Sequence, residues 1–380
     1  MSDAFFHKLL GDSQATHLGT GWVSGVASVF FGMLGVGGVL VLLFPAVLTL
    51  PEARTLYPIG IIRLIIQATI AAALVLGAIS AILRQRRVLG LTGAALGLTA
   101  VLLGGASTPL PTELGSKVGI GLDWFLLDLL VMTLVFVPVE RLWPLHPQQK
   151  TFRPEWTTDA FYFVSTHLPA QLITFVMLLP ATMASKWLAI PALMQTVGSL
   201  PLYVQLPLAI VVADFSQYAT HLAFHKIPFL WRFHSIHHSI KTMDWIAGSR
   251  SHFVDILITR GLILIPMTLV GFSQSAMAGY LIFVSFHATF CHTDFRPRVR
   301  WLEPYFVTGR YHHWHHAAHK DVVDVNFAIH LPFIDRLFGT YHLPKDAWPD
   351  QYGLVGRTIP AGFFAQFVAP FQRKKSAVTA

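Results

Sequence analysis

Charged residues are scarce in this chain of 380 residues. Asp, Glu, Lys and Arg together make up 12% of it, whereas hydrophobic residues make up 54%. A soluble domain carries about 25% charged residues, so this deficit argues against an ordinary soluble fold. Several apolar runs also reach the roughly 20 residues that a helix needs to cross a bilayer. We therefore predict an all-α, polytopic membrane protein.

Cysteine and several well-known motifs are also missing or nearly so. The single cysteine, Cys291, excludes an internal disulfide and a cysteine-based metal site. The chain has no Gly-rich dinucleotide fingerprint, no cysteine set for an iron–sulfur cluster and no HExxH zinc motif. Glu-x-x-His pairs of carboxylate di-iron bundles are absent too. Residues 1–21 lack the pattern of a cleavable signal peptide.

The formal net charge of +8 does not require a nucleic-acid partner. Lys and Arg accumulate in the cytoplasmic loops of inner-membrane proteins, and this bias explains the excess. Six apolar segments are predicted to span the membrane, and a longer run over 255–291 forms either two spans or a re-entrant hairpin. The six segments are 22–50, 57–83, 88–107, 123–143, 161–180 and 200–220.

Basic residues alternate between the two ends of successive spans. Arg84, Arg86 and Arg87 follow the second span, whereas the loop between the fifth and sixth spans has only Lys186. This alternation predicts a bacterial inner-membrane protein whose later loops face the cytoplasm. A polar stretch with Pro and Gly at 107–117 suggests a domain boundary. We expect an N-terminal membrane extension of three helices at 1–117, a catalytic domain at 118–345 with its histidine core at 208–342, and a tail at 346–380.

Histidine is unusually abundant, with nineteen residues, and it is clustered. Side chains three or four positions apart share one face of a helix. His221 and His225 are four apart, and Asp214 and Tyr218 fall on the same stripe. Two HxxHH units follow, at 234–238 and 312–316. One histidine at a helix end is ordinarily a satisfied polar residue, but three spaced units are hard to explain by packing.

A metal centre explains this pattern most simply, because imidazole binds iron, zinc, copper and nickel. Two ions of coordination number five or six need roughly eight to ten protein ligands, and the clusters supply that many. His287 and His292, at the end of a long apolar run, extend the set, and His292 is favoured because it lies closer to the predicted cytoplasmic exit. The predicted ligands are His221, His225, His234, His237, His238, His287, His292, His312, His315 and His316.

Metal-bound imidazoles usually donate the other ring N–H to a carboxylate or carbonyl. The residues predicted to hold the ligands in this way, or to support them nearby, are Asp214, Tyr218, Arg250, His252, Asp255 and Asn326. His252 is also a candidate ligand. Asp244, Asp294 and Asp324 are further acidic residues near enough in sequence to serve. No catalytic side chain is predicted beyond the metal centre.

Several motifs occur together in the C-terminal two thirds. They are DxxxxxxHxxxH at 214–225, LWRFHSIHHS at 230–239, WIAGSRSHFVD at 245–255, HTDFR at 292–296, TGRYHHWHH at 308–316 and NFAIHLPFIDRLFGTYHLP at 326–344. In these motifs the chain resembles the fatty acid hydroxylase / sterol desaturase superfamily of integral-membrane enzymes. It departs from the usual pattern at Gly309, Asp255 and Asp294, where Pro, Glu and Asn are common. Residues 1–117 lie outside the resemblance.

The resemblance implies a helical cap at the cytoplasmic face that carries two iron ions. Such an enzyme uses O2 as co-substrate to hydroxylate or desaturate a C–H bond of a lipid, either a fatty acyl chain or a sterol-like body. Cleavage of an ether lipid stays open. Because no nicotinamide or iron–sulfur motif is present, electrons are expected from a separate ferredoxin, cytochrome b5-like protein or reductase. The bilayer and a membrane lipid are the other expected partners.

Two other classes of protein also use many histidines in a membrane. A bis-His haem b electron carrier needs facing pairs in mid-membrane, whereas these clusters lie at span ends and are denser. A divalent-metal transporter with histidine-rich loops would show irregular polar tracts, whereas these histidines keep helical register beside aromatic residues such as Phe233, Tyr311 and Trp314. Iron content and haem absorption separate the three classes.

Overall fold

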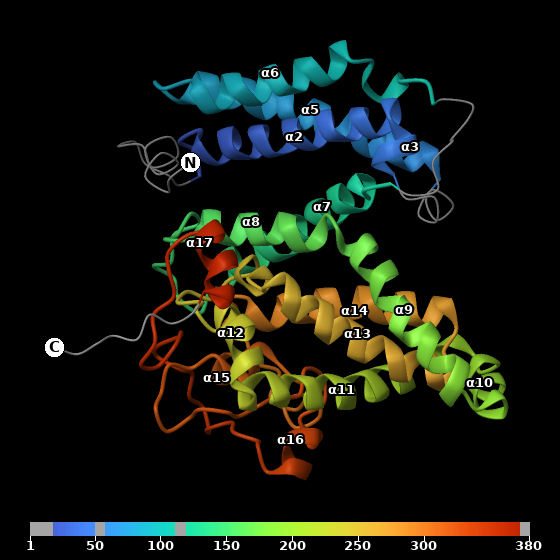
Figure 1. The fold of residues 1–380 in the computed structure, drawn as a ribbon. Coiled ribbons are helices and arrows are strands. Elements are labelled where there is room, and N and C mark those ends of the chain that lie inside the picture. Colours follow the sequence, from blue (N-terminus) through green and yellow to red (C-terminus); the bar gives the residue numbers. More distant parts are fainter. Residues whose placement is uncertain (1–17, 50–57, 111–118, 373–380) are drawn as a thin grey trace. The chain divides into compact units, whose positions relative to one another are not determined.

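The computed structural model describes residues 18–49, 58–110 and 119–372, which are helical with only isolated β-bridges between them (Figure 1). The all-α expectation is therefore confirmed for the described residues. The chain forms two compact units, 1–133 and 134–380. The predicted boundary at 117/118 falls within 111–118, outside the described residues, so that call stays a prediction.

The first unit is built around three long helices, α2 (Trp22–Leu43), α5 (Ile59–Leu83) and α6 (Val88–Leu102). It also contains α3 (Pro45–Leu48), η1 (Gly105–Ser107) and the first part of α7 (Leu122–Leu142). The long helices approach closely through small residues: a Cβ added at Gly93 would lie 1.9 Å from Ser28 Oγ. Ser28 donates a 2.6 Å hydrogen bond to the carbonyl of Ala73. This packing is typical of helices that associate within a membrane.

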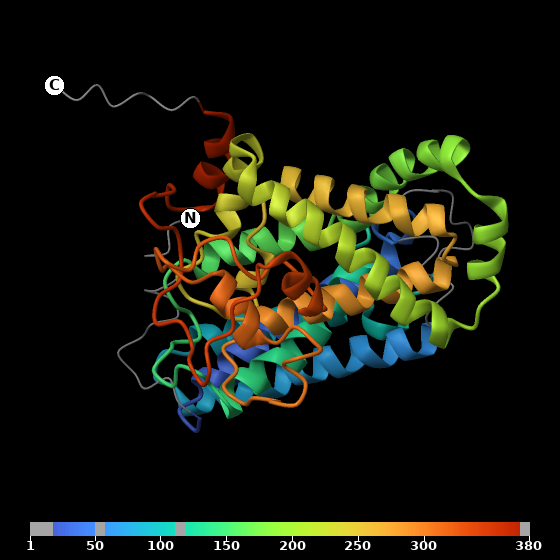
Figure 2. The ribbon, with the colours of Figure 1, turned by 90° about the horizontal axis from the view of Figure 1, so that it is seen from below.

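The second unit contains the rest of α7 and all later elements. These are α8 (Trp156–His167), α9 (Ala170–Leu188), α10 (Pro191–Gly198), α11 (Leu202–Lys226), α12 (Pro228–His237), η2 (Ala247–Ser249), α13 (Phe253–Val270), α14 (Gln274–His292), α15 (Gly309–His315), α16 (Phe333–Phe338), α17 (Phe363–Val368) and η3 (Ala369–Phe371). Figures 1 and 2 show α11, α13 and α14 side by side. Their shared core includes Ala213, Met267 and Tyr280.

The hairpin between α13 and α14 shows how the long apolar run at 255–291 folds. Gly271 ends α13 with φ 89°, a left-handed conformation that favours glycine. A Cβ at this position would also lie 2.4 Å from Met194 Cα. The run is therefore two helices that reverse direction at Gly271, close to the predicted break.

Another reversal brings the first two histidine units face to face. Ile227 is extended, as expected for a residue before proline, and this ends α11 at Lys226. Pro228 then begins α12 at a position where proline is tolerated because its missing N–H has no partner within the helix. The histidines at the end of α11 consequently face those of α12.

Five described helical segments are long and apolar enough to cross a membrane: Trp22–Leu43, Ile59–Leu83, Val88–Ser107, Leu122–Leu142 and Phe253–Val270. The pair Trp156–His167 and Leu172–Leu188, bent by 53°, would add one more if it forms a single span. Helix α11 covers the predicted sixth span but is not in this set, and neither is α14. Buried polar residues such as Gln205, Asp214 and Thr220 make α11 less apolar than the others.

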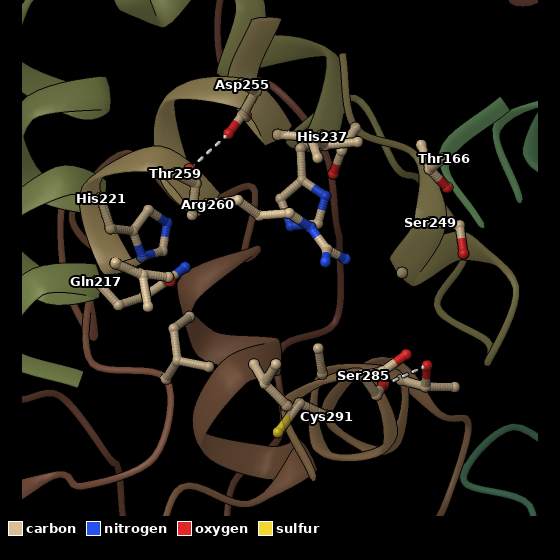
Figure 3. Close-up of a pocket in the computed structure, with 18 of the residues that line it drawn as sticks. Thr166, Gln217, His221, His237, Ser249, Asp255, Thr259, Arg260, Ser285 and Cys291 are labelled. Carbon is tan, nitrogen blue, oxygen red and sulfur yellow. Dashed lines mark hydrogen bonds between the residues drawn. The ribbon is translucent and has the colours of Figure 1, made fainter. Parts of the chain in front are cut away.

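A cavity of about 230 Å³ lies among α8, α9, α11, α13 and α14 (Figure 3). Apolar side chains, including Ile263, Leu264 and Val284, form part of its wall. Polar side chains also line it, and Figure 3 shows Arg260 pointing into it. Its lining further includes five histidines from the predicted ligand set, which are His221, His234, His237, His292 and His312. The cavity thus joins an apolar space to the histidine cluster.

Candidate metal centre

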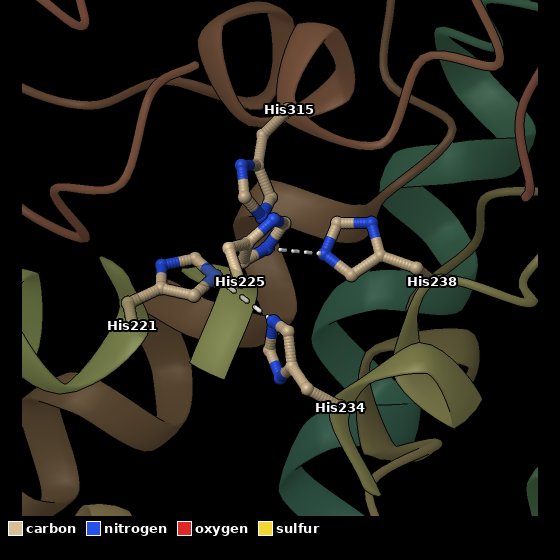
Figure 4. Close-up of side chains that lie close together, drawn as sticks. All are labelled: His221, His225, His234, His238 and His315. Atoms are coloured by element: carbon tan, nitrogen blue, oxygen red, sulfur yellow. Dashed lines mark hydrogen bonds between the residues drawn. The ribbon is translucent and has the colours of Figure 1, made fainter. Parts of the chain in front are cut away.

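Two adjacent histidine clusters form at the meeting point of α11, α12, α14 and α15. The five-histidine cluster consists of His221, His225, His234, His238 and His315 (Figure 4). The four-histidine cluster consists of His237, His292, His312 and His316. In each cluster the candidate ligand nitrogens lie within 4.8 Å of one another. The clusters touch, because the ring centroids of His238 and His316 are 4.5 Å apart.

Nine of the ten predicted ligands are brought together in this way. Helix α11 supplies the i, i+4 pair, α12 and α15 with their C-caps supply the two HxxHH units, and α14 ends on His292. Residues separated by up to 95 positions, from His221 to His316, thereby converge on one buried site.

In most of these rings Nδ1 forms a hydrogen bond on the side that faces away from the cluster. Backbone carbonyls accept this N–H in four cases: Phe327 O from His221 at 2.9 Å, Arg250 O from His237 at 3.1 Å, Ala288 O from His292 at 2.7 Å and Val325 O from His315 at 2.7 Å. Carboxylates face Nδ1 in two more cases, Asp255 on His234 at 2.7 Å and Asp324 on His225 at 2.9 Å. A neutral imidazole that donates from Nδ1 keeps a lone pair on Nε2.

The inward-facing Nε2 atoms meet in pairs that hydrogen bonding cannot satisfy. His221 Nε2 and His234 Nε2 are 3.0 Å apart in the five-histidine cluster. His237 Nε2 and His292 Nε2 are 3.4 Å apart in the four-histidine cluster. Because all four rings donate from Nδ1, each contact places one lone pair against another. A cation between the two nitrogens removes this repulsion, so the donor set of both clusters fits a metal ion.

Burial keeps these imidazoles neutral. Loss of solvation, together with the neighbouring imidazoles, lowers the pKa of His238, His312 and His316 well below its ordinary value. His315 is buried as well, and its Nε2 has no hydrogen-bond partner in the described part of the chain. Neutral rings are the form that coordinates metals.

His287 differs from the other predicted ligands because both of its ring nitrogens already have hydrogen-bond partners. Its Nε2 donates to Val307 O at 2.9 Å, which leaves Nδ1 free to accept from His330 Nδ1 at 2.9 Å. His330 Nε2 can then accept from the hydroxyl of Tyr280 at 3.4 Å. Each donor in this buried chain meets an acceptor without a metal. His287 also lies outside both clusters, and we remove it from the proposed ligand set.

The residues expected to support the ligands divide into two groups. Asp255 contacts His234 directly, and Arg250 contacts His237 through its backbone carbonyl. The others act at a distance from the rings. His252 caps α13 and its Nε2 bonds Phe367 O, so it is not positioned as a ligand.

The remaining predicted residues shape the segment 324–331. Asp214 accepts hydrogen bonds from the backbone N–H groups of Ile329, His330 and Leu331 at 2.7–3.2 Å. Asn326 bonds the carbonyls of Tyr311 and His342, whereas the Tyr218 hydroxyl pairs with Thr340 Oγ1 at 3.0 Å. This segment carries the carbonyls that hold His221 and His315.

Sequence reasoning missed several of these contacts. The carbonyls of Ala288, Val325 and Phe327 could not be predicted, because every residue has a backbone carbonyl whatever its side chain. Asp335 was also missed: it accepts from the N–H groups of Phe327 and Ala328 and from the Tyr311 hydroxyl. A conspicuous aspartate inside the apolar run NFAIHLPFIDRLF was the available signal.

Comparisons with known proteins agree with this geometry. The family description Fatty acid hydroxylase matches residues 206–340, which include every histidine of both clusters. Ornithine lipid hydroxylase OlsE of Rhizobium tropici is 33% identical over 174 residues, covering 46% of this chain and 52% of that protein. Human alkylglycerol monooxygenase is 27% identical over 138 residues, 36% of this chain and 31% of that protein.

Residues 206–340 are thus similar to the fatty acid hydroxylase family. A third relative, very-long-chain aldehyde decarbonylase GL1-5 of Oryza sativa subsp. indica, is 25% identical over 140 residues, 35% of this chain and 22% of that protein. This chain spans about half the length of the first of these relatives and less of the others. No solved structure matches it significantly.

Residues 324–326 carry backbone strain beside the histidine clusters. Asp324 and Asn326 adopt left-handed conformations, with φ of 62° and 59°, on either side of Val325. Such conformations cost of order 1 kcal/mol each and persist where surrounding contacts enforce them. Here Asp324 is tied to His225 and Lys226, at 2.9 and 2.7 Å. The strained pair aims the Val325 carbonyl at His315.

Exchange of single histidines tests the assignment of the clusters. His237→Ala and His315→Ala each remove one nitrogen of a cluster, and we expect loss of bound iron in the purified, membrane-inserted protein. His287→Gln is the matched control and should retain iron, because its ring serves only the hydrogen-bond chain to His330. Elemental analysis of the three variants provides the measurement. Full iron in His237→Ala, or its loss only in His287→Gln, contradicts the assignment.

Removal of Asp214 should weaken the centre without abolishing it. Asp214→Ala leaves three backbone N–H groups without their acceptor, which loosens the segment that holds His221 and His315. Supporting contacts of this kind are worth roughly 10–100-fold in metal affinity. The measurement is competition for iron by a chelator, with the exposed Asp321→Ala as the charge-matched control. Equal iron retention in the two variants would show that Asp214 does not support the ligands.

Proposed function

We propose that this chain is a membrane-bound di-iron oxygenase that uses O2 and external electrons to hydroxylate or desaturate a C–H bond of a lipid. The observation that carries the proposal is the pair of lone-pair contacts, His221–His234 and His237–His292, one in each cluster. Two metal ions account for both contacts at once. The similarity of residues 206–340 to the fatty acid hydroxylase family favours iron.

Nine imidazoles would hold the two ions, five on one and four on the other. Iron supplies the activation of O2 when it is bound, and the protein supplies the surroundings. All-neutral ligands leave the positive charge of the iron pair uncompensated, which distinguishes this site from a carboxylate di-iron centre. The carboxylates Asp255 and Asp324 act only through Nδ1 of a ligand, where they fix ring orientation and raise basicity.

The cavity beside the centre is the proposed lipid chamber. Its apolar wall of Ile263, Leu264 and Val284 suits an acyl or sterol-like body, and the same cavity reaches His237 and His292. A pocket of this kind fixes orientation with a few polar groups and excludes water. Arg260 and Gln217 are the polar side chains that would contact the less apolar part of the substrate.

The relatives act on different lipids, as their names state: an ornithine lipid, an alkylglycerol and a very-long-chain aldehyde. A lipid or a lipid-derived chain is named in each case, and we assign a lipid substrate to the present chain. Five apolar helices support a membrane location. The alternation of basic loops favours a bacterial inner membrane with the centre on the cytoplasmic side. Hydroxylation is preferred because the relatives named above include a hydroxylase and a monooxygenase.

Lipid mass spectrometry tests the activity directly. Cells that express the chain should contain a lipid class heavier by one oxygen, or lighter by two hydrogens, than cells that express His237→Ala at the same level. The metal variant controls for the effect of the membrane protein itself. Identical lipid profiles, in a strain where the protein holds two irons and a reductant is present, would refute the lipid oxygenase. A haem Soret band in the purified protein would favour an electron carrier instead.

Filling the cavity should block the substrate but not the metal. Val284→Trp adds an indole ring to the chamber wall, and we expect product to fall at least about tenfold because overpacking leaves no room for the lipid. Ile282→Trp is the matched control, since Ile282 lies two residues away and is 52% exposed. Iron content should stay normal in both variants. Equal product from both would place substrate binding elsewhere.

A further inference from the structure

A second hollow, separate from the lipid chamber, lies on the loop side of the centre. His146, Lys150, Lys241, Asp350 and Tyr352 are among the residues that line it, and its volume is about 580 Å³. None of its lining residues also lines the lipid chamber. The proposed lipid reaction does not use this hollow.

The floor of the hollow is hydrogen-bonded to the helix that carries two members of the four-histidine cluster. The Tyr352 hydroxyl pairs with His313 Nδ1 at 2.9 Å, and His313 directly follows His312 in the chain. The N–H of Gly353 donates to the carbonyl of His316 at 3.3 Å. Tyr352 also forms a β-bridge with Ala317. Two routes, each with a single hydrogen bond, thus connect the hollow to the cluster.

Such routes matter because the coupling that carries an electron decays slowly through covalent bonds, more steeply across a hydrogen bond and most steeply across empty space. His313 is fully buried, and its ring also packs against Trp348, with centroids 5.1 Å apart. A buried aromatic path therefore runs from the hollow to the peptide that bears His312. The cavity proposed for the lipid has a more apolar lining, which suits a lipid better than a water-soluble partner.

The rim of the hollow carries positive charge. Lys150 and Lys241 are exposed, and Arg141 donates a 3.3 Å hydrogen bond to the carbonyl of the neighbouring Gln149. The exposed carboxylate of the lining, Asp350, is paired with His319 at 2.5 Å. The deeper Arg153 is matched by Asp159 and Asp244, each at 2.7 Å. The unbalanced charge at the rim is basic, which attracts an acidic partner.

We propose that this hollow is the docking site of an acidic, water-soluble redox protein that reduces the metal centre. The inference rests on the proposed function, which requires an external electron donor. In each encounter one electron would leave the reduced cofactor of the donor. The Tyr352–His313 and Gly353–His316 contacts would carry it toward the histidine clusters that would hold the iron. Two encounters supply the two electrons that, with two protons, O2 and the lipid C–H bond, yield a hydroxylated lipid and one water.

Charge reversal at the rim tests the docking. Reduced [2Fe–2S] ferredoxin of acidic plant type is mixed anaerobically with the oxidised iron protein in nanodiscs, and reduction is followed by stopped flow. Lys150→Glu and Lys241→Glu should each slow reduction by at least about tenfold at low salt, within the range of electrostatic steering. Lys186→Glu, an exposed charge outside the hollow, is the matched control and should react like the wild type. Photoreduced deazaflavin should reduce all four proteins equally.

Binding and electron transfer are then separated. Ferredoxin binding to the metal-free protein, measured by calorimetry, should weaken in Lys150→Glu but not in Tyr352→Phe. Tyr352→Phe removes the hydroxyl at His313, so it should keep its iron and slow the limiting rate at saturating ferredoxin.

Equal reduction rates in Lys150→Glu and Lys186→Glu would overturn the proposal. It would also be overturned if the two hollow lysines governed binding to phosphatidylglycerol vesicles and not to ferredoxin. Normal ferredoxin-driven reduction with no oxidised lipid would reject the proposed substrate class and leave the docking site intact.

Discussion

The opposition of imidazole lone pairs in a buried site is the constraint on which this structure depends. Four rings donate from Nδ1 to backbone carbonyls or a carboxylate, and this fixes their Nε2 lone pairs inward. Removing those rings from water is unfavourable unless their nitrogens find partners. Because the paired Nε2 atoms present lone pairs to each other, a cation between them satisfies both. His287 is buried as well, but its ring nitrogens are satisfied by Val307 O and His330 and need no cation.

The protein meets this constraint largely through its backbone. The carbonyls of Phe327 and Val325 belong to an irregular segment, which could not by itself hold two rings in place. Asp214 and Asp335 accept five backbone N–H bonds from positions 327–331 and fix that segment against α11 and α15. These two buried carboxylates hold the segment in place because each accepts several backbone N–H groups. They support the proposed ligands without contacting them directly.

The sequence predicted the helical class, which is confirmed for the described residues, and it named the nine histidines that the structure brings together. Their role as ligands stays a prediction. They could be named because helical spacing of three and four residues is visible in the chain. The carbonyl partners could not be predicted, since every residue has a carbonyl and its direction depends on the tertiary fold. We predicted that residues 200–220, which lie in α11, span the membrane because their apolar residues outnumber their polar ones. Its polar residues, Gln205 and Asp214 among them, lower its hydropathy below that of the five candidate spans.

The two hollows beside the histidine clusters suit the two partners of the proposed lipid oxygenase. A lipid arrives from an apolar phase and an electron carrier from water, so one entrance cannot serve both. Helices α11, α13 and α14 present an apolar chamber to His237 and His292, whereas the loop at 350–353 presents a basic hollow to His312 and His316. All four of these histidines belong to the same cluster. The four-histidine cluster would therefore lie nearer the electron donor, and the contact between the rings of His238 and His316 links it to the five-histidine cluster.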